Sequence, residues 1–124
     1  MLITNMKVLI IVSKDSQLNS LCDLIKNSGC DCEVYNNSID GLRKYKENSF
    51  DIVITDMKMP LVSGLEVVRI IKKINNDTPV LVYGNCDKTA KLCSEHGAER
   101  IITKDFTPEL ILNEIKDLCH SLKK

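Results

Sequence analysis

The chain has 124 residues, a length that suits one domain able to bury roughly two-thirds of the surface that its unfolded chain would expose. Lysine plus arginine and aspartate plus glutamate both number 17, so no global field favours binding to nucleic acid or to a membrane surface. The longest apolar stretch near the N-terminus, residues 8–12, is far too short for a signal-peptide core or a membrane span. We therefore expect a cytoplasmic protein whose six cysteines are thiols.

Short apolar runs alternate along the chain with segments of helical periodicity. Strands are predicted at 8–12, 32–35, 52–55, 80–83 and 101–102. Helices are predicted at 18–28, 38–48, 65–74, 87–96 and 107–122. Ser38 and Asp87 are candidate helix caps, and Thr107 with Pro108 is a good start for the last helix. Five strand-helix units with short links predict an α/β fold with a parallel sheet covered by helices on both faces.

Two charged residues stand where apolar strands of this sheet end. Asp56 follows the run 52–55 and precedes a turn closed by Pro60 and Gly64. By itself, such an aspartate is most often a cap for the turn. Lys104 ends the fifth predicted strand in the same manner, however, and ligands of open α/β sheets sit at the carboxyl ends of the strands. The pair therefore favours a binding or reaction site at this edge.

With these residues in view, the chain resembles the receiver domain of bacterial response regulators, the flavodoxin-like module of two-component signalling. The segments that carry the resemblance are KVLII (7–11), DIVITDMKMP (51–60), SGLEVV (63–68), TPVLV (78–82), GA (97–98) and TK (103–104). The resemblance covers about residues 7–122. It implies a doubly wound, five-stranded parallel sheet in the order 2-1-3-4-5 with five helices, so that residues 1–124 form a single receiver domain with no output domain in this chain.

The resemblance further implies that Asp56 is the phosphoacceptor and that Lys104 grips the phosphoryl oxygens. The sequence departs from the family pattern at several other functional positions. Where the family has two acidic Mg²⁺ ligands, a switch serine or threonine, and an aromatic residue that follows the switch, this chain has Val12 and Ser13, Gly84, and Ile101. The family's proline after the lysine is replaced by Asp105, so we expect a trans peptide bond there. The pattern is that of an atypical, degenerate receiver.

Lysines are predicted around the single remaining carboxylate. Lys104, Lys58 and Lys14 all follow strand ends or the loop after Asp56, and an ion pair between Asp56 and Lys104 would hold the pocket in one state. Lys14 and Lys58 could equally be ordinary solvated side chains. One acid among lysines is a poor host for a hard cation, so we expect no resident metal or cofactor and weak Mg²⁺ binding at most. Phosphorylation by the conventional route should be slow or absent.

These observations leave two functions open. The first is phosphorelay signalling with Asp56 as a weak phosphoacceptor, and the second is a protein-interaction or dimerisation module without phosphate chemistry. In either case the expected partner is a histidine kinase or a downstream signalling protein, and a homodimer would use the last two helices and the fifth strand. No motif of an independent enzyme is present.

The cysteines offer a third reading. Cys86, Cys93 and His96 could form a metal or redox site, although the spacing matches no common zinc motif. Cys22 and Cys119 fall on apolar helix faces and are expected to pack in the core. Cys30 and Cys32 are separated by one residue, a spacing that strains a disulfide.

Overall fold

In the computed structural model, which describes residues 6–85 and 87–122, five parallel strands form one sheet. The strand order is β2-β1-β3-β4-β5, as predicted. The strands are β1 (Lys7–Ile11), β2 (Asp31–Tyr35), β3 (Ile52–Asp56), β4 (Val80–Tyr83) and β5 (Arg100–Ile102). The helices are α1 (Leu21–Asn27), α2 (Ser38–Glu47), α3 (Gly64–Ile74), α4 (Lys88–Glu95) and α5 (Pro108–Leu122), with a 3-10 turn, η1 (Gln17–Ser20), before α1.

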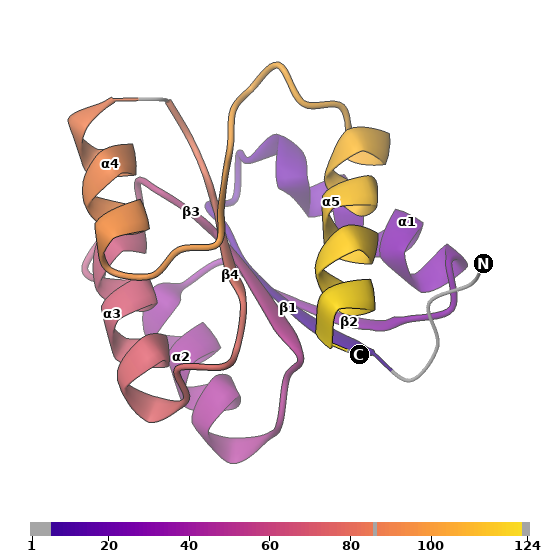
Figure 1. The fold of residues 1–124 in the computed structure, drawn as a ribbon, viewed down its shortest axis with the longest axis horizontal. Coiled ribbons are helices and arrows are strands. Elements are labelled where there is room, and N and C mark those ends of the chain that lie inside the picture. The colour runs from indigo at the N-terminus through magenta and orange to yellow at the C-terminus, as the bar shows by residue number, and fades with distance from the viewer. Residues whose placement is uncertain (1–5, 86, 123–124) are drawn as a thin grey trace.

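The helices cover both faces of the sheet, with α1 and α5 on one side and α2, α3 and α4 on the other (Figure 1). Alternate strand residues supply the two cores because successive side chains point to opposite faces. Ile10, Ile54 and Leu81 pack toward α1 and α5, whereas Leu9 and Val53 pack toward the other three helices. The continuous apolar runs of the sequence are thus explained by a sheet that is buried on both faces.

Local capping differs from the sequence prediction at one helix. The cap of α2 is Asn37, whose Oδ1 accepts hydrogen bonds from the backbone N–H groups of Ile39 (2.8 Å) and Asp40 (3.2 Å). Ser38, the predicted cap, is buried and its hydroxyl donates to the carbonyl of Val62 at 2.8 Å. The serine therefore ties α2 to the loop before α3.

Other local predictions hold with small changes. Asp87 caps α4, as predicted, through hydrogen bonds from two backbone N–H groups of its first turn. Among the described residues no peptide bond is cis, so the Lys104–Asp105 bond is trans as expected. Ile74, an apolar residue in the predicted helix 65–74, is the last residue of α3 and is 48% exposed.

The loop between β3 and α3 holds Leu61 in a conformation that leucine rarely adopts. Its φ angle is 69° and its side chain is 83% exposed, so the strain is not offset by burial. Asparagine tolerates this region, and Leu61→Asn is expected to raise the free energy of unfolding by about 0.5–1 kcal/mol in urea titrations. Leu110→Asn, at an exposed position in α5, is the control and should give no gain. Equal stabilities of Leu61→Asn and wild type would contradict the strain argument.

Candidate functional site

A cavity of about 290 Å³ lies at the carboxyl end of the sheet. Residues that follow or end four of the strands line it: Ser13 after β1, Asp56 at the end of β3, Gly84 after β4 and Lys104 after β5. The predicted convergence of Asp56 and Lys104 at one edge of the sheet is therefore confirmed. Parallel strands bring these positions together because their carboxyl ends share an edge.

Asp56 is the last residue of β3 and only 7% exposed. Its Oδ2 accepts a hydrogen bond from the backbone N–H of Ser13 at 2.9 Å, and its Oδ1 accepts one from the hydroxyl of Ser16 at 3.2 Å. Ser16 also caps η1, because its Oγ accepts from the N–H of Leu18 at 3.2 Å. The loop after β1 thus engages both carboxylate oxygens.

Burial raises the pKa of Asp56 above its usual range, and the hydrogen bonds from Ser13 and Ser16 oppose this rise. Both serines lie in the loop after β1, where the sequence predicted Lys14 as a neighbour of Asp56. Hydroxyl and amide donors, rather than an ammonium group, therefore balance part of the desolvation cost of the carboxylate.

The three predicted lysines are placed differently from one another. Lys58 and Lys104 line the cavity, with exposed side chains, whereas Lys14 is exposed and does not line it. No ion pair within the described part of the chain joins Asp56 to a lysine, so the predicted Asp56–Lys104 pair is not formed in this structure. The Lys104 side chain is exposed to solvent, and the hydrogen bonds that Asp56 accepts come instead from Ser13 and Ser16 in the loop after β1.

The positions that depart from the family pattern have distinct surroundings. Val12 is fully buried in the core beneath α1 and α5. Ile101 is half-buried and packs against the core on the opposite face. At Gly84, an added Cβ atom would lie 2.8 Å from the Cβ of Met57, which is itself buried. The space that a switch hydroxyl would need is therefore filled by Met57.

Sequence reasoning missed several polar residues that line the same cavity, of which two are acidic and one is a tyrosine. Asp15 follows β1, Asp87 follows β4, and Tyr83 ends β4 directly beside Asp56 in the sheet register. The Tyr83 hydroxyl donates to Oε1 of Gln17 at 3.3 Å, and burial followed by the charge of Asp56 raises the pKa of Tyr83. Both aspartates lie a few residues beyond strand ends, so a search of those loops for acids would have found them.

The cysteine alternative gains no support from the geometry. Cys93 is fully buried in the core while His96, three residues later, is exposed. Cys86 and the side chain of Cys119 lie outside the described residues. Across residues 6–85 and 87–122, no three histidine, cysteine or acidic side chains are grouped so that they could hold a metal ion.

Comparison with known proteins agrees with the fold. The family model described as "Response regulator receiver domain" matches residues 8–116. A receiver domain protein from Clostridium thermocellum has a crystal structure that superimposes with a TM-score of 0.86 at 33% identity, covering 95% of this chain and 97% of that one. The structure titled "BeF3 Activated DrrB Receiver Domain" gives a TM-score of 0.82 at 26% identity, with 97% and 99% coverage.

Among curated proteins, the chain is 28% identical to the "Transcriptional regulatory protein CpxR homolog" of Haemophilus influenzae, over 90% of this chain and 49% of that protein. The identity to "Response regulator ArlR" of Staphylococcus saprophyticus is also 28%, with 90% and 51% coverage. The chain thus spans about half the length of the curated relatives that it matches.

The fold and the carboxylate at the end of β3 define a signalling module of the doubly wound, flavodoxin-like class. The chain belongs to the response regulator receiver domain family of two-component signalling. None of the helices in its described part is long and apolar enough to cross a membrane.

The buried carboxylate predicts a pH dependence of stability. Because the folded-state pKa of Asp56 is raised, the folded protein holds this proton more tightly than the unfolded chain, and stability is lost as the pH rises through that pKa. Asp56→Asn should therefore be more stable than wild type at about pH 7, and the difference should shrink toward about pH 3. The thermal midpoint measured across this range checks the expectation.

Asp77→Asn, at an exposed turn position, is the control and should leave the stability nearly unchanged at either pH. An Asp56→Asn protein that is less stable than wild type throughout would mean that the hydrogen bonds from Ser13 and Ser16 outweigh the cost of burial.

Proposed function

We propose that this receiver domain signals through protein contacts with Asp56 unphosphorylated or only weakly phosphorylated. The observation that carries the proposal is the engagement of both Asp56 oxygens by Ser13 and Ser16. A phosphoryl donor that approaches Asp56 would compete with these hydrogen bonds for the lone pairs of the carboxylate, which we expect to slow the attack. We propose no enzymatic activity for the chain itself.

The donor set of the cavity does not fit a resident Mg²⁺ ion. Mg²⁺ requires oxygen ligands in near-octahedral geometry. Val12 is apolar and buried, the N–H of Ser13 already points at Asp56, and one oxygen of Asp87 caps α4. Asp15 is a further carboxylate that lines the cavity, and two positively charged residues, Lys58 and Lys104, line it as well. We therefore propose that Mg²⁺ binds weakly at most.

Phosphoryl transfer to a carboxylate brings two anions together, and the barrier is lowered mainly by oriented positive charge and donors. Lys104 and Lys58 are placed to supply part of that charge. A switch hydroxyl at residue 84 is lacking, and loss of a single transition-state donor typically costs about 10²–10³ in rate. The expected loss in rate supports slow phosphorylation of Asp56.

Receiver domains in general interact with histidine kinases and effector proteins, and this chain is also similar to part of "Sensor histidine kinase RcsC" of Escherichia coli. We propose a protein partner, or a second copy of the chain, that binds the surface formed by α4, β5 and α5. Leu92 on α4 and Leu110 on α5 are 43% and 48% exposed, and we propose that they contribute to this surface. Arg100 and Glu114 form an exposed ion pair on the same surface, with a separation of 3.3 Å.

The test is labelling with acetyl phosphate, read as a mass increase that Asp56→Ala abolishes, together with calorimetric titration of Mg²⁺. Wild type is expected to stay essentially unmodified and to give no isotherm in the low millimolar range. Ser13→Asp keeps the backbone N–H and adds a carboxylate to the cavity, so it should strengthen Mg²⁺ binding. Ser20→Asp, at an exposed position on η1, is the matched control and should not. Rapid, Mg²⁺-dependent labelling of wild type would show the proposal to be wrong.

A further inference from the structure

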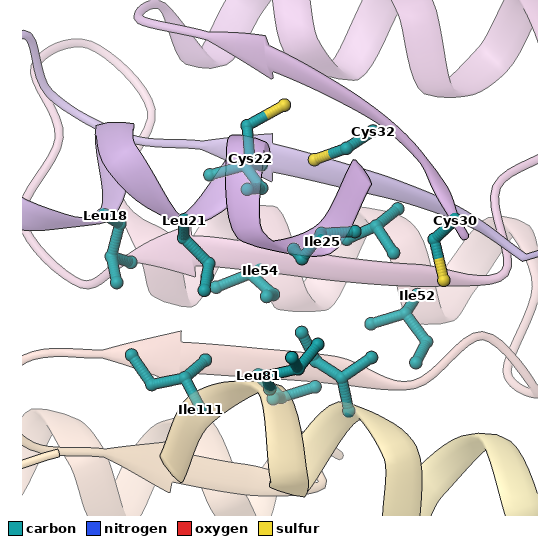
Figure 2. Packing of buried hydrophobic residues seen from close by; sticks show 14 of the residues in the cluster. Leu18, Leu21, Cys22, Ile25, Cys30, Cys32, Ile52, Ile54, Leu81 and Ile111 are labelled. Atoms are coloured by element: carbon teal, nitrogen blue, oxygen red, sulfur yellow. The ribbon is translucent and has the colours of Figure 1, made fainter. Parts of the chain in front are cut away.

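Two buried thiols face each other between α1 and the edge strand β2. Cys22 lies in the first turn of α1 and is 8% exposed, and Cys32 lies in β2 and is 5% exposed. Figure 2 shows their sulfur atoms pointing toward one another, whereas the sulfur of Cys30 points away from this pair. The two residues come from elements that pack directly against each other.

Both cysteines belong to the hydrophobic core between the sheet and helices α1 and α5, and a metal site does not account for their facing thiols. No suitable group of three ligands exists among the residues that the structure describes, so the pair lacks the further donors that a thiolate metal centre needs. Disulfide formation requires two sulfurs whose Cβ atoms approach closely and whose side chains point together. Cys22 and Cys32 meet the second condition in the reduced protein.

We propose that Cys22 and Cys32 form an intramolecular disulfide when the protein meets a low-molecular-weight disulfide such as oxidised glutathione. The Cys22 thiolate attacks one sulfur of the oxidant, which releases one glutathione thiolate and leaves a mixed disulfide on Cys22. The Cys32 thiolate then attacks the Cys22 sulfur and releases the second glutathione. The two cysteines lose two protons and two electrons, and one oxidised glutathione becomes two reduced molecules.

The surroundings of Cys32 make the second step slow. Burial raises the pKa of its thiol, the neighbouring Cys22 and Cys30 raise it further, and Lys26 of α1 opposes the rise. Because the thiolate is the attacking species, this raised pKa slows the attack of Cys32 on the mixed disulfide, so the linkage forms only where a disulfide oxidant persists. This behaviour is typical of regulatory rather than permanent disulfides in reducing compartments.

The linkage would join the beginning of α1 to the sheet. α1 follows directly on η1, the turn that begins after Ser16, and Ser16 is the residue whose hydroxyl binds Asp56. Oxidation would therefore restrain the chain close to the loop that engages the candidate phosphoacceptor.

To test this, the folded chain is oxidised with excess oxidised glutathione under native conditions. The remaining thiols are then blocked, and the linkages are mapped by mass spectrometry. Digestion with trypsin and an Asp-specific protease places Cys22, Cys30 and Cys32 in separate peptides, because the chain is cleaved before Asp23 and before Asp31. The expected product is a Cys22–Cys32 cross-linked peptide that has lost two hydrogens. The oxidised protein should melt roughly 5–10 °C above the reduced form.

Matched variants locate the linkage independently. Cys22→Ser and Cys32→Ser should each abolish the cross-link, whereas Cys30→Ser and Cys93→Ser should retain it. The peptide map of the wild-type protein answers the question even if a variant fails to fold. A cross-link that includes Cys30, an intermolecular product, or mixed disulfides without a Cys22–Cys32 linkage would overturn the proposal, as would complete recovery of free thiols.

Discussion

Replacing Gly64 with alanine is expected to lower the free energy of unfolding by about 3 kcal/mol, because a new Cβ atom would strike the backbone that carries Asp56. Gly64 is the first residue of α3 and is buried. A Cβ atom added to it would meet the carbonyl oxygen of Asp56 and lie 2.8 Å from the Cα of Met57. Backbone atoms cannot rotate away from this contact as the end of a flexible side chain can. The N–H of Gly64 also donates to the carbonyl of Met57 at 2.9 Å, which holds the two segments together.

Urea unfolding of Gly64→Ala measures this effect. Glu66→Ala changes an exposed residue in the same helical turn and should stay within about 0.5 kcal/mol of wild type. A loss below about 1 kcal/mol for Gly64→Ala would mean that the β3–α3 connection relaxes freely. In that case the position of Asp56 would not be fixed by the close approach of α3.

The parallel sheet and the edge at which Asp56 lies were predictable because both depend on local patterns that the chain repeats, whereas the order 2-1-3-4-5 was predicted from the resemblance to receiver domains. Apolar runs of strand length alternate with helical segments, and right-handed connections then allow few sheet orders. A charged residue directly after such a run falls at the carboxyl edge whatever the details of the loops. This is why Asp56 and Lys104 could be placed on the same cavity from the sequence alone.

The partners of Asp56 were not predictable in the same way. The backbone of the loop after β1 determines which groups point at the carboxylate, and its 3-10 turn leaves no periodic signal. Charge alone favoured an ion pair with Lys104, but the N–H of Ser13 and the hydroxyl of Ser16 reach the buried oxygens instead. The cap of α2 was missed for a related reason: Asn37 and Ser38 are adjacent cap formers, and only the tertiary contact of Ser38 with Val62 decides between them.

A buried ammonium group on α3 was also missed, because its partners are distant in the sequence. The Lys72 side chain is only 8% exposed, and its Nζ lies 2.6 Å from Oε2 of Glu99. Nζ also donates to the carbonyl of Thr78 at 2.8 Å. The other carboxylate oxygen of Glu99 accepts from the N–H of Val80 at 2.8 Å. These contacts join α3, the start of β4 and the loop before β5.

Lys72→Met is therefore expected to lower the free energy of unfolding by about 2–3 kcal/mol, somewhat less than breaking a fully buried pair, because Glu99 is 30% exposed. Methionine keeps the aliphatic stem but leaves the Thr78 carbonyl and the Glu99 carboxylate without their donor. Arg69→Met is the control on the same helix. Arg69 pairs with Glu66 at 3.2 Å, but these side chains are 55% and 49% exposed, so its loss should cost less than about 0.5 kcal/mol.

A double-mutant cycle with Glu99→Gln separates the pair from the other contacts of Lys72. Glutamine retains an acceptor for the N–H of Val80 but removes the charge, so the coupling energy between residues 72 and 99 is expected to be about 1–2 kcal/mol. Raising the salt concentration should weaken the exposed Arg69 pair more than this one, because Lys72 is shielded from solvent. Lys72→Met could lower the free energy of unfolding no more than Arg69→Met does. In that case the ammonium group of Lys72 contributes nothing beyond the packing of its aliphatic chain, and the junction of α3, β4 and β5 is held by apolar packing alone.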